Sequence, residues 1–197
     1  LTQNQMQVRD TNFYGLSAQT LGNDKESLLI EEGIAVNSTA SLDYSDAEAV
    51  KVLGNPTEGA LLLWLKKAGV DYLNLRESAE VLEELPFSTE RKYMATIVKS
   101  SLFEGKTILY VKGAPEIVSG LCKNIENNVS KTDIENQLVE YQNQAMRTLG
   151  FAYQMLDSKA DVFKDGKVVA DNLTFMGVVA ISDPVRQDVP AAVAECM

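Results

Sequence analysis

The sequence contains no histidine, and this absence removes several kinds of site at once. Without an imidazole there is no Ser-His-Asp triad, no histidine general base and no histidine-containing zinc site. The two cysteines, Cys122 and Cys196, lack metal-ligand or disulfide spacing, so we expect ordinary packed or partly exposed thiols in a reducing, cytosolic setting. Any chemistry must therefore depend on carboxylates, lysines and the backbone.

Long apolar runs and an excess of basic residues are also missing. The longest apolar runs, 60–65 and 175–181, are far shorter than the roughly 20 residues that span a bilayer, and no signal peptide opens the chain. We therefore expect no membrane contact. The formal net charge of -10 argues against a general nucleic-acid surface, because phosphate backbones bind clustered lysine and arginine. An anionic ligand would need a local basic pocket.

What is present is the composition of one globular domain. The chain has 197 residues, of which 45% are apolar and 23% charged, so it is long enough to bury a sizeable core. Neither a G-x-x-x-x-G-K-[ST] loop nor a G-x-G-x-x-G turn after a strand occurs. Because these two common phosphate cradles are absent, a nucleotide would have to be held by side chains.

The hydrophobic periodicity predicts an α+β fold, with an antiparallel β-sheet flanked by helices. The short, charged connections between several apolar segments are typical of antiparallel hairpins. The polar segment 38–48 reads as a loop, and Arg147 reads as the end of the longest helix. Helices are expected at 24–37, 56–69, 115–121 and 130–146, and Asp24 and Ser130 are the expected N-caps of the first and the last of them. Strands are expected at 6–14, 79–87, 93–100, 107–113, 148–156 and 173–181.

Two segments in the first half could hold a nucleotide base. In "NPTEGALL", Glu58 lies in the first turn of a helix, where it either complements the helix dipole or accepts a hydrogen bond from an exocyclic amine such as that of adenine. In "LPFSTERKYM", Phe87 is either a core aromatic or, if it faces a cleft, a plate on which a base stacks. Lys92 would then neutralise phosphate, and Met94 would line the same apolar slot.

Two later segments offer positive charge. In "VKGAPE", Lys112 is either a solvated turn lysine or a cation beside a ligand that the small Gly113 and Ala114 allow to approach the backbone. In "MRTLGFAY", Arg147 suits both a cap at the negative end of a helix dipole and a phosphate contact. The residues alone leave these alternatives open.

The order of these segments resembles the P-type ATPases, the ion pumps that form an aspartyl phosphate. The opening "LTQNQM" is similar to the tail of their D-K-T-G-T-L-T-x-N signature. The four segments match, in order, the nucleotide-domain motifs of the type II cation pumps, and "GVVAISDPVR" is similar to the return to the phosphorylation domain. The resemblance covers nearly the whole chain, and calcium transporters are the nearest likeness. It divides the chain into a remnant at 1–4, a nucleotide-binding domain at 5–182 and a hinge at 183–197.

The resemblance implies an ATP-binding N domain, which belongs to the cytoplasmic part of an integral membrane pump. Its partners would be ATP, with Mg²⁺ in the intact pump, and the phosphorylation and actuator domains of the same full-length chain. The phosphorylated aspartate would lie upstream of Leu1, so we expect the isolated chain to bind ATP without hydrolysing it. By analogy, Phe87 stacks on adenine and Glu58 forms a hydrogen bond with it. Lys112, Gly113 and Ala114 form the pocket wall. Lys92 and Arg147 contact the phosphates, and Met94 and Leu149 pack near adenine and ribose.

Two positions depart from the family pattern. The hinge motif D-P-P-R reads Asp183, Pro184, Val185 and Arg186 here, so the stiff hinge that the family pattern implies is not expected from this sequence. Thr89 stands where some calcium pumps have an arginine near the phosphates, which predicts weaker triphosphate binding. The alternative functions are an acidic protein-interaction module without nucleotide binding and a haloacid dehalogenase-type phosphatase. The phosphatase would need a D-x-D-x-[TV] loop, which the sequence lacks.

Overall fold

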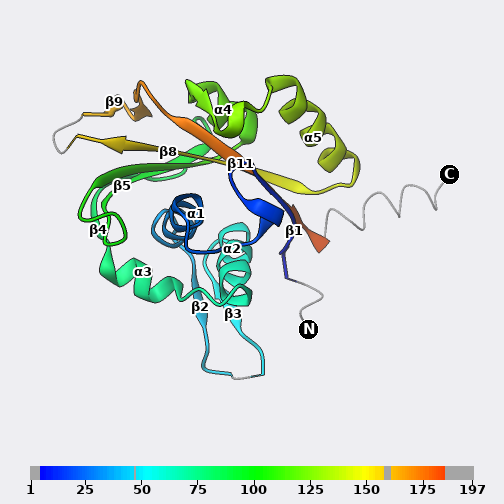
Figure 1. Cartoon of the computed structure of the whole chain (residues 1–197). Coiled ribbons are helices and arrows are strands. Elements are labelled where there is room, and N and C mark those ends of the chain that lie inside the picture. Colours follow the sequence, from blue (N-terminus) through cyan, green and yellow to red (C-terminus); the bar gives the residue numbers. More distant parts are fainter. Residues whose placement is uncertain (1–4, 47, 158–160, 185–197) are drawn as a thin grey trace.

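The computed structural model describes residues 5–46, 48–157 and 161–184, and a central β-sheet organises them (Figure 1). Helices lie against both faces of this sheet. Its strands are β1 (Gln7–Phe13), β4 (Glu80–Leu85), β5 (Tyr93–Lys99), β6 (Thr107–Gly113), β7 (Asn124–Ile125), β8 (Arg147–Leu156) and β11 (Thr174–Ser182).

The strand order is β1-β11-β8-β6-β5-β4, with β7 added beside β11. Every pair is antiparallel except the short β7–β11 pair, which confirms the predicted α+β fold with an antiparallel sheet. Gln7 of β1 pairs with Ser182 of β11, so the first and last described segments lie side by side. Strands β1 and β11, which begin and end the described sheet in chain order, are therefore neighbours in it.

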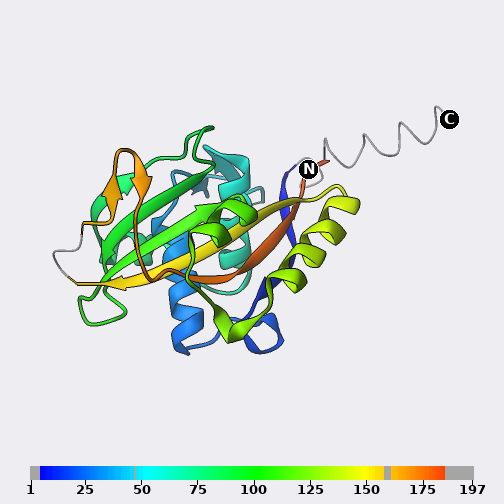
Figure 2. The same ribbon diagram turned by 90° about the horizontal axis from the view of Figure 1, so that it is seen from above.

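Helices cover the two faces of the sheet unequally (Figures 1 and 2). One face carries α1 (Lys25–Val36), α2 (Pro56–Lys67) and α3 (Tyr72–Ser78), and the other carries α4 (Pro115–Leu121) and α5 (Lys131–Asn143). Outside the sheet are the hairpins β2 (Ser41–Asp43) with β3 (Lys51–Leu53) and β9 (Phe163–Lys164) with β10 (Lys167–Val168), and the 3-10 turns η2 (Ser17–Gln19) and η3 (Glu126–Asn128).

Each face of the sheet has its own apolar core because side chains alternate along a strand. In β6, Ile108 and Tyr110 pack into the core under α1 and α2, whereas Leu109 and Val111 pack into the core under α4 and α5. All four are buried. This double burial explains why the central strands read as nearly continuous hydrophobic runs.

Local signals set the ends of the two best-predicted helices. The Asn55 side chain accepts hydrogen bonds from the backbone amides of Thr57 (2.8 Å) and Glu58 (3.1 Å). Asn55 therefore caps the N-terminus of α2. Gly69, with φ of 83°, follows its C-cap. The Ser130 hydroxyl accepts from the Asp133 amide at 3.1 Å, which confirms the predicted N-cap of α5. Short-range chemistry therefore places α2, and with it Glu58.

Three details of the predicted elements are wrong. The longest helix ends at Asn143, because Ala145 has a left-handed φ of 57°, and Arg147 is the first residue of β8 rather than a helix cap. The segment 38–48 is not all loop, since β2 pairs with β3. Helix α3 was not predicted, because its seven residues are too short to show a clear period.

Two further expectations concern the N-cap of α1 and the chain ends. Asp24 occupies the N-cap position, but its carboxylate accepts from the Ser27 hydroxyl at 2.6 Å rather than from a backbone amide. Among the described residues, no helix combines the length and apolar character needed to cross a bilayer. The predicted remnant at 1–4, and all of the predicted hinge after Pro184, lie outside the described residues.

Candidate nucleotide pocket

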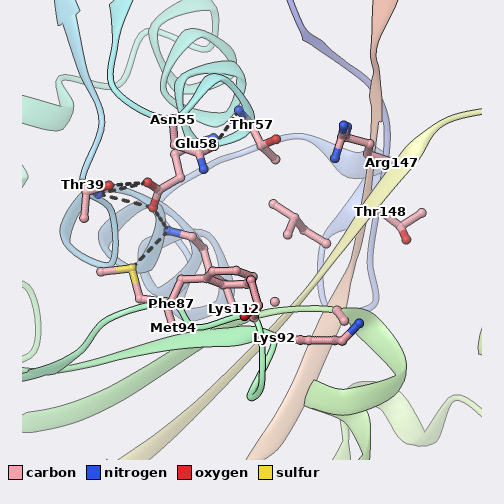
Figure 3. Close-up of a pocket in the computed structure, with 14 residues that line it drawn as sticks. Thr39, Asn55, Thr57, Glu58, Phe87, Lys92, Met94, Lys112, Arg147 and Thr148 are labelled. Atoms are coloured by element: carbon pink, nitrogen blue, oxygen red, sulfur yellow. Dashed lines mark hydrogen bonds and ion pairs between the residues drawn. The ribbon is translucent and has the colours of Figure 1, made fainter. Parts of the chain in front are cut away.

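A pocket of about 510 Å³ opens where α2, the β4–β5 connection and the ends of β5, β6 and β8 meet (Figure 3). Its volume is in the usual range for small-molecule sites. Every site residue expected from the sequence lies in its lining, although they come from four separated segments. These residues are Glu58, Phe87, Lys92, Met94, Lys112, Gly113, Ala114, Arg147 and Leu149, and Thr39, Asn55, Thr57, Thr89 and Thr148 complete the lining.

One end of the pocket is built on a buried ion pair. Lys112 of β6 places its Nζ 2.5 Å from Oε2 of Glu58, and only 7% of Glu58 and 6% of Lys112 is exposed. Lys112 also donates to the carbonyl of Asn37 and lies 3.9 Å from the Met94 sulfur. Lys112 is therefore not a solvated turn lysine, and its charge is balanced by Glu58.

The ionisation of this pair follows from its surroundings. Burial alone would raise the pKa of Glu58, but the positive charge of Lys112 and hydrogen bonds from Lys112 and Thr39 hold it below its ordinary value. Burial lowers the pKa of Lys112, and the adjacent carboxylate opposes that shift. We conclude that Glu58 is a carboxylate at neutral pH and that Lys112 is its counter-ion.

Phe87 provides an exposed ring beside this pair. It lies in the connection between β4 and β5 and is 59% exposed, so it is not a core aromatic. Its ring borders the same pocket as Met94, which is buried. An exposed aromatic plate with an apolar wall behind it is an arrangement that suits a planar heterocycle.

Gly113 is required by the protein's own packing. A Cβ at this position would come within 2.3 Å of the Lys92 carbonyl oxygen and 2.6 Å of the Tyr93 Cα. The backbone of the 88–92 turn therefore sits directly on Gly113, and the Ala114 amide donates to the Lys92 carbonyl at 3.0 Å. This contact fixes Lys92, whose φ is 65°, at the pocket wall.

The opposite end of the pocket carries accessible positive charge. The side chains of Lys92 and Arg147 are exposed, and Figure 3 shows Arg147 and Thr148 on the side away from Thr39, Glu58 and Met94. Arg147 Nε donates to Oδ2 of Asp183 at 2.8 Å. Glu58 balances the charge of Lys112 and Asp183 balances that of Arg147, so Lys92 and Arg147 are the cations of the lining whose side chains stay accessible.

Sequence reasoning missed several lining residues. Thr39 bonds to Glu58 through both its amide and its hydroxyl, yet it lies in the polar segment that was read as a loop. Asn55 was not singled out, and Thr148 was predicted only as part of a strand. A threonine three residues beyond the end of α1 carries no sequence signal that would have singled it out.

The described residues contain no group of three or more histidines, cysteines, aspartates or glutamates that could hold a metal ion. The pocket lining includes one carboxylate, Glu58, which is already paired with Lys112. Hard cations such as Mg²⁺ prefer several oxygen ligands. The described lining of the pocket does not gather several such ligands.

Comparison with known proteins identifies the family of the chain. The family described as "P-type ATPase, cytoplasmic domain N" matches residues 26–188. The chain belongs to this family. Its N-domain relatives include "Calcium-transporting ATPase PAT1" of Dictyostelium discoideum, which is 34% identical over all of this chain and 18% of its own length.

Two bacterial relatives extend the comparison. "Calcium-transporting ATPase 1" of Lactococcus lactis is 30% identical over 99% of this chain and 22% of its own length. "Probable cation-transporting P-type ATPase" of Mycoplasma genitalium is 32% identical over the whole of this chain and 20% of its own length. The chain thus spans about a fifth of the length of these curated relatives.

Proposed function

We propose that the pocket binds ATP, with the base at the Thr39–Glu58–Met94 end and the phosphates between Lys92 and Arg147. The observation that carries this proposal is the convergence of an exposed aromatic ring, a buried Lys–Glu pair and two accessible cations around one 510 Å³ pocket. Phe87 would stack on adenine, the Glu58 pair would face its polar edge, and Met94 and Leu149 would pack near base and ribose.

The charge distribution supports a phosphate-bearing ligand. The protein as a whole has a formal net charge of -10, yet the described residues that line the pocket include three cations and one carboxylate. Glu58 and Asp183 balance two of these cations, but the side chains of Lys92 and Arg147 are accessible, and accessible cations favour an anion at that place. Lys112, Gly113 and Ala114 would form the wall beside the base.

In the intact pump, this pocket would hold ATP while a second domain accepts the γ-phosphoryl group. The calcium-transporting relatives suggest that the reaction drives cation transport, with calcium as the first candidate. Mg²⁺ would bind through the phosphates of ATP and supply charge neutralisation during transfer. The residues described here bind and orient the nucleotide, and the phosphorylation and actuator domains would be its partners.

Titration of the N domain with ATP, followed by backbone amide chemical shifts and calorimetry, tests this function. We expect saturable binding with shifts concentrated at Thr39, Phe87, Lys92, Lys112 and Arg147. Shifts scattered over unrelated surface sites would instead favour an acidic interaction module. Incubation of the purified domain with γ-labelled ATP should give no phosphoprotein, and a stable phosphoenzyme would contradict the assignment of the nucleophile to another part of the pump.

A further inference from the structure

The position of the Phe87 ring depends on its backbone, because little packing holds the side chain. The residue is 59% exposed, and no other aromatic ring of the described residues stacks against it. It lies in the β4–β5 connection (residues 86–92), outside any helix or strand. A side chain on such a segment keeps one position only where hydrogen bonds and packing hold the segment itself. The bonds of the β4–β5 connection therefore decide where the ring lies at the pocket (Figure 3).

Arg91 supplies two of those bonds, one on each side of Phe87. Its guanidinium Nη2 donates to the carbonyl of Pro86, which belongs to the peptide bond that leads into Phe87. Its backbone amide donates to the Ser88 hydroxyl at 3.0 Å, and the next amide, that of Lys92, donates to the Ser88 carbonyl at 2.8 Å. The residues before and after Phe87 are thus both bonded to the end of the connection.

The guanidinium of Arg91 also contacts structure outside the connection. Its Cζ lies 5.9 Å from the centre of the Tyr93 ring, which is within the range of a cation–π contact. Tyr93 is buried, and its hydroxyl accepts from the Val168 amide at 2.9 Å, so the ring is held between β5 and the β9–β10 hairpin. A Cβ at Gly166 of that hairpin would lie 3.5 Å from Nη1 of Arg91. Arg91 therefore joins the segment that carries Phe87 to a fixed part of the sheet.

The surroundings of Arg91 distinguish it from a ligand-binding cation. It is not among the residues that line the pocket, whereas its neighbour Lys92 is. Within the described parts of the chain it forms no ion pair, although the sequence has 28 acidic and 18 basic residues. Its Nε atom is buried. The guanidinium is therefore used inside the protein, on a backbone carbonyl and an aromatic face.

We propose that Arg91 is a positioning residue for nucleotide binding, which holds the backbone on both sides of Phe87 so that the ring stays in place to stack on the base. This inference rests on the proposed function and deepens it. Without the guanidinium, the Pro86 carbonyl loses its partner and the ring samples more positions, so ordering it on binding costs more conformational entropy. The loss falls on binding of the base and not of the phosphates.

Calorimetric titration of the N domain with ATP and with adenosine tests this role. Arg91→Met keeps an unbranched side chain and removes the guanidinium. We expect it to raise the Kd of both ligands by about three- to ten-fold, a part of what a stacked base contributes. A cation that contacts phosphate would instead change the Kd of ATP alone. Arg91→Lys, whose ammonium group can still donate to the Pro86 carbonyl, should recover most of the affinity.

The same substitution in a Phe87→Ala background separates positioning from a general effect on the domain. If Arg91 acts through the ring, adding Arg91→Met to Phe87→Ala should change the Kd of ATP by less than about two-fold. Lys164→Met is the matched control, because it removes an exposed cation from the adjacent hairpin at a position outside the pocket lining. It should leave both Kd values unchanged.

Denaturant unfolding of each variant reports its fold. Ser88→Ala, which removes the acceptor of the Arg91 amide, repeats the comparison with and without the Phe87 ring if Arg91→Met does not fold. Three results would overturn the inference while nucleotide binding stands: an unchanged Kd in Arg91→Met, a change for ATP alone, or the same change with and without the ring. An equal change in Lys164→Met would also overturn it, because it would indicate a general effect of charge. Failure of the unmodified domain to bind ATP overturns the proposed function and this inference together.

Discussion

Arg147 Nε lies 2.8 Å from Oδ2 of Asp183, so an arginine at the pocket is tied to the residue that follows β11. The arginine side chain is 47% exposed, whereas that of Asp183 is 5% exposed. The two residues stand at the ends of adjacent strands, since Arg147 pairs with Ile181. The phosphate contact that we propose for Arg147 would therefore involve the same side chain that pairs with the residue after β11.

Replacing Asp183 by asparagine should tighten ATP binding. The substitution removes a negative charge beside the expected phosphates and weakens the hold on Arg147, while it keeps an oxygen that can accept a hydrogen bond. We expect the Kd for ATP to fall by about five-fold, the scale of a partly exposed ion pair, and the Kd for adenosine to stay constant. Calorimetry with both ligands measures this, and an equal change for adenosine would contradict the electrostatic explanation.

Phe87→Ala should weaken ATP binding more than Lys92→Ala does. Loss of an aromatic plate under a base costs about 1 to 3 kcal/mol, whereas an exposed cation contributes about 1 kcal/mol or less. Titration calorimetry measures both. Phe87→Tyr keeps the ring and should bind nearly as well, and Leu82→Ala, at an exposed apolar position outside the pocket lining, is the control. Equal small losses for Phe87→Ala and Lys92→Ala would show that the stacking assignment is wrong.

The Lys112–Glu58 pair should be strongly coupled. Glu58→Gln leaves Lys112 buried without its counter-ion and should lower the free energy of unfolding by about 3 to 5 kcal/mol. Adding Lys112→Met should recover much of that loss, because the double variant buries no uncompensated charge. Urea unfolding of the two single variants and the double variant gives the coupling energy.

The control for this cycle is Glu83→Gln, at an exposed position on β4, which should change the free energy of unfolding by about 0.5 kcal/mol or less. The free energies of unfolding lost in Glu58→Gln and in Lys112→Met could instead add up to the loss in the double variant. That result would mean that the two side chains do not interact in the folded protein.

Glu32 should make stability fall as pH rises. It is fully buried in α1, where Ser100 and Tyr110 donate to its carboxyl oxygens at 2.8 and 2.7 Å. Burial raises its pKa, and those two hydrogen bonds only partly oppose the shift. The folded state therefore binds more protons than the unfolded state above the ordinary value of 4.5, and the free energy of unfolding decreases with pH in that window.

Glu32→Gln should remove this contribution while it keeps hydrogen-bonding groups for both hydroxyls. Denaturant unfolding between pH 4.5 and 8 should show a variant whose stability declines less with pH than that of the unmodified domain. Glu104→Gln, at an exposed carboxylate in the turn after β5, is the control and should leave the pH profile unchanged. Parallel profiles for Glu32→Gln and the unmodified domain would show that Glu32 is ionised without cost.

The sequence determined the elements whose causes are local. Alternation and short charged connections identified the six long strands, and Asn55, Pro56 and Gly69 bracket α2 by capping and turn chemistry that acts within a few residues. The ordered motifs also predicted nine site residues, all of which the structure brings into the lining of one pocket, and the residues alone left two interpretations for several of them. Where local signals were weak, as in α3 and β2, the prediction failed.

Only the tertiary structure decided which of the pocket residues form ion pairs and hydrogen bonds with one another. Glu58 and Lys112 are 54 positions apart, and neither sequence segment indicates that each neutralises the other or that Thr39 holds the carboxylate. Arg147 read as a helix cap, and only the pairing of β8 with β11 brings it to Asp183. Capping and periodicity act over a few residues, whereas burial, counter-ions and hydrogen-bond partners depend on which distant segments the sheet and helices bring together.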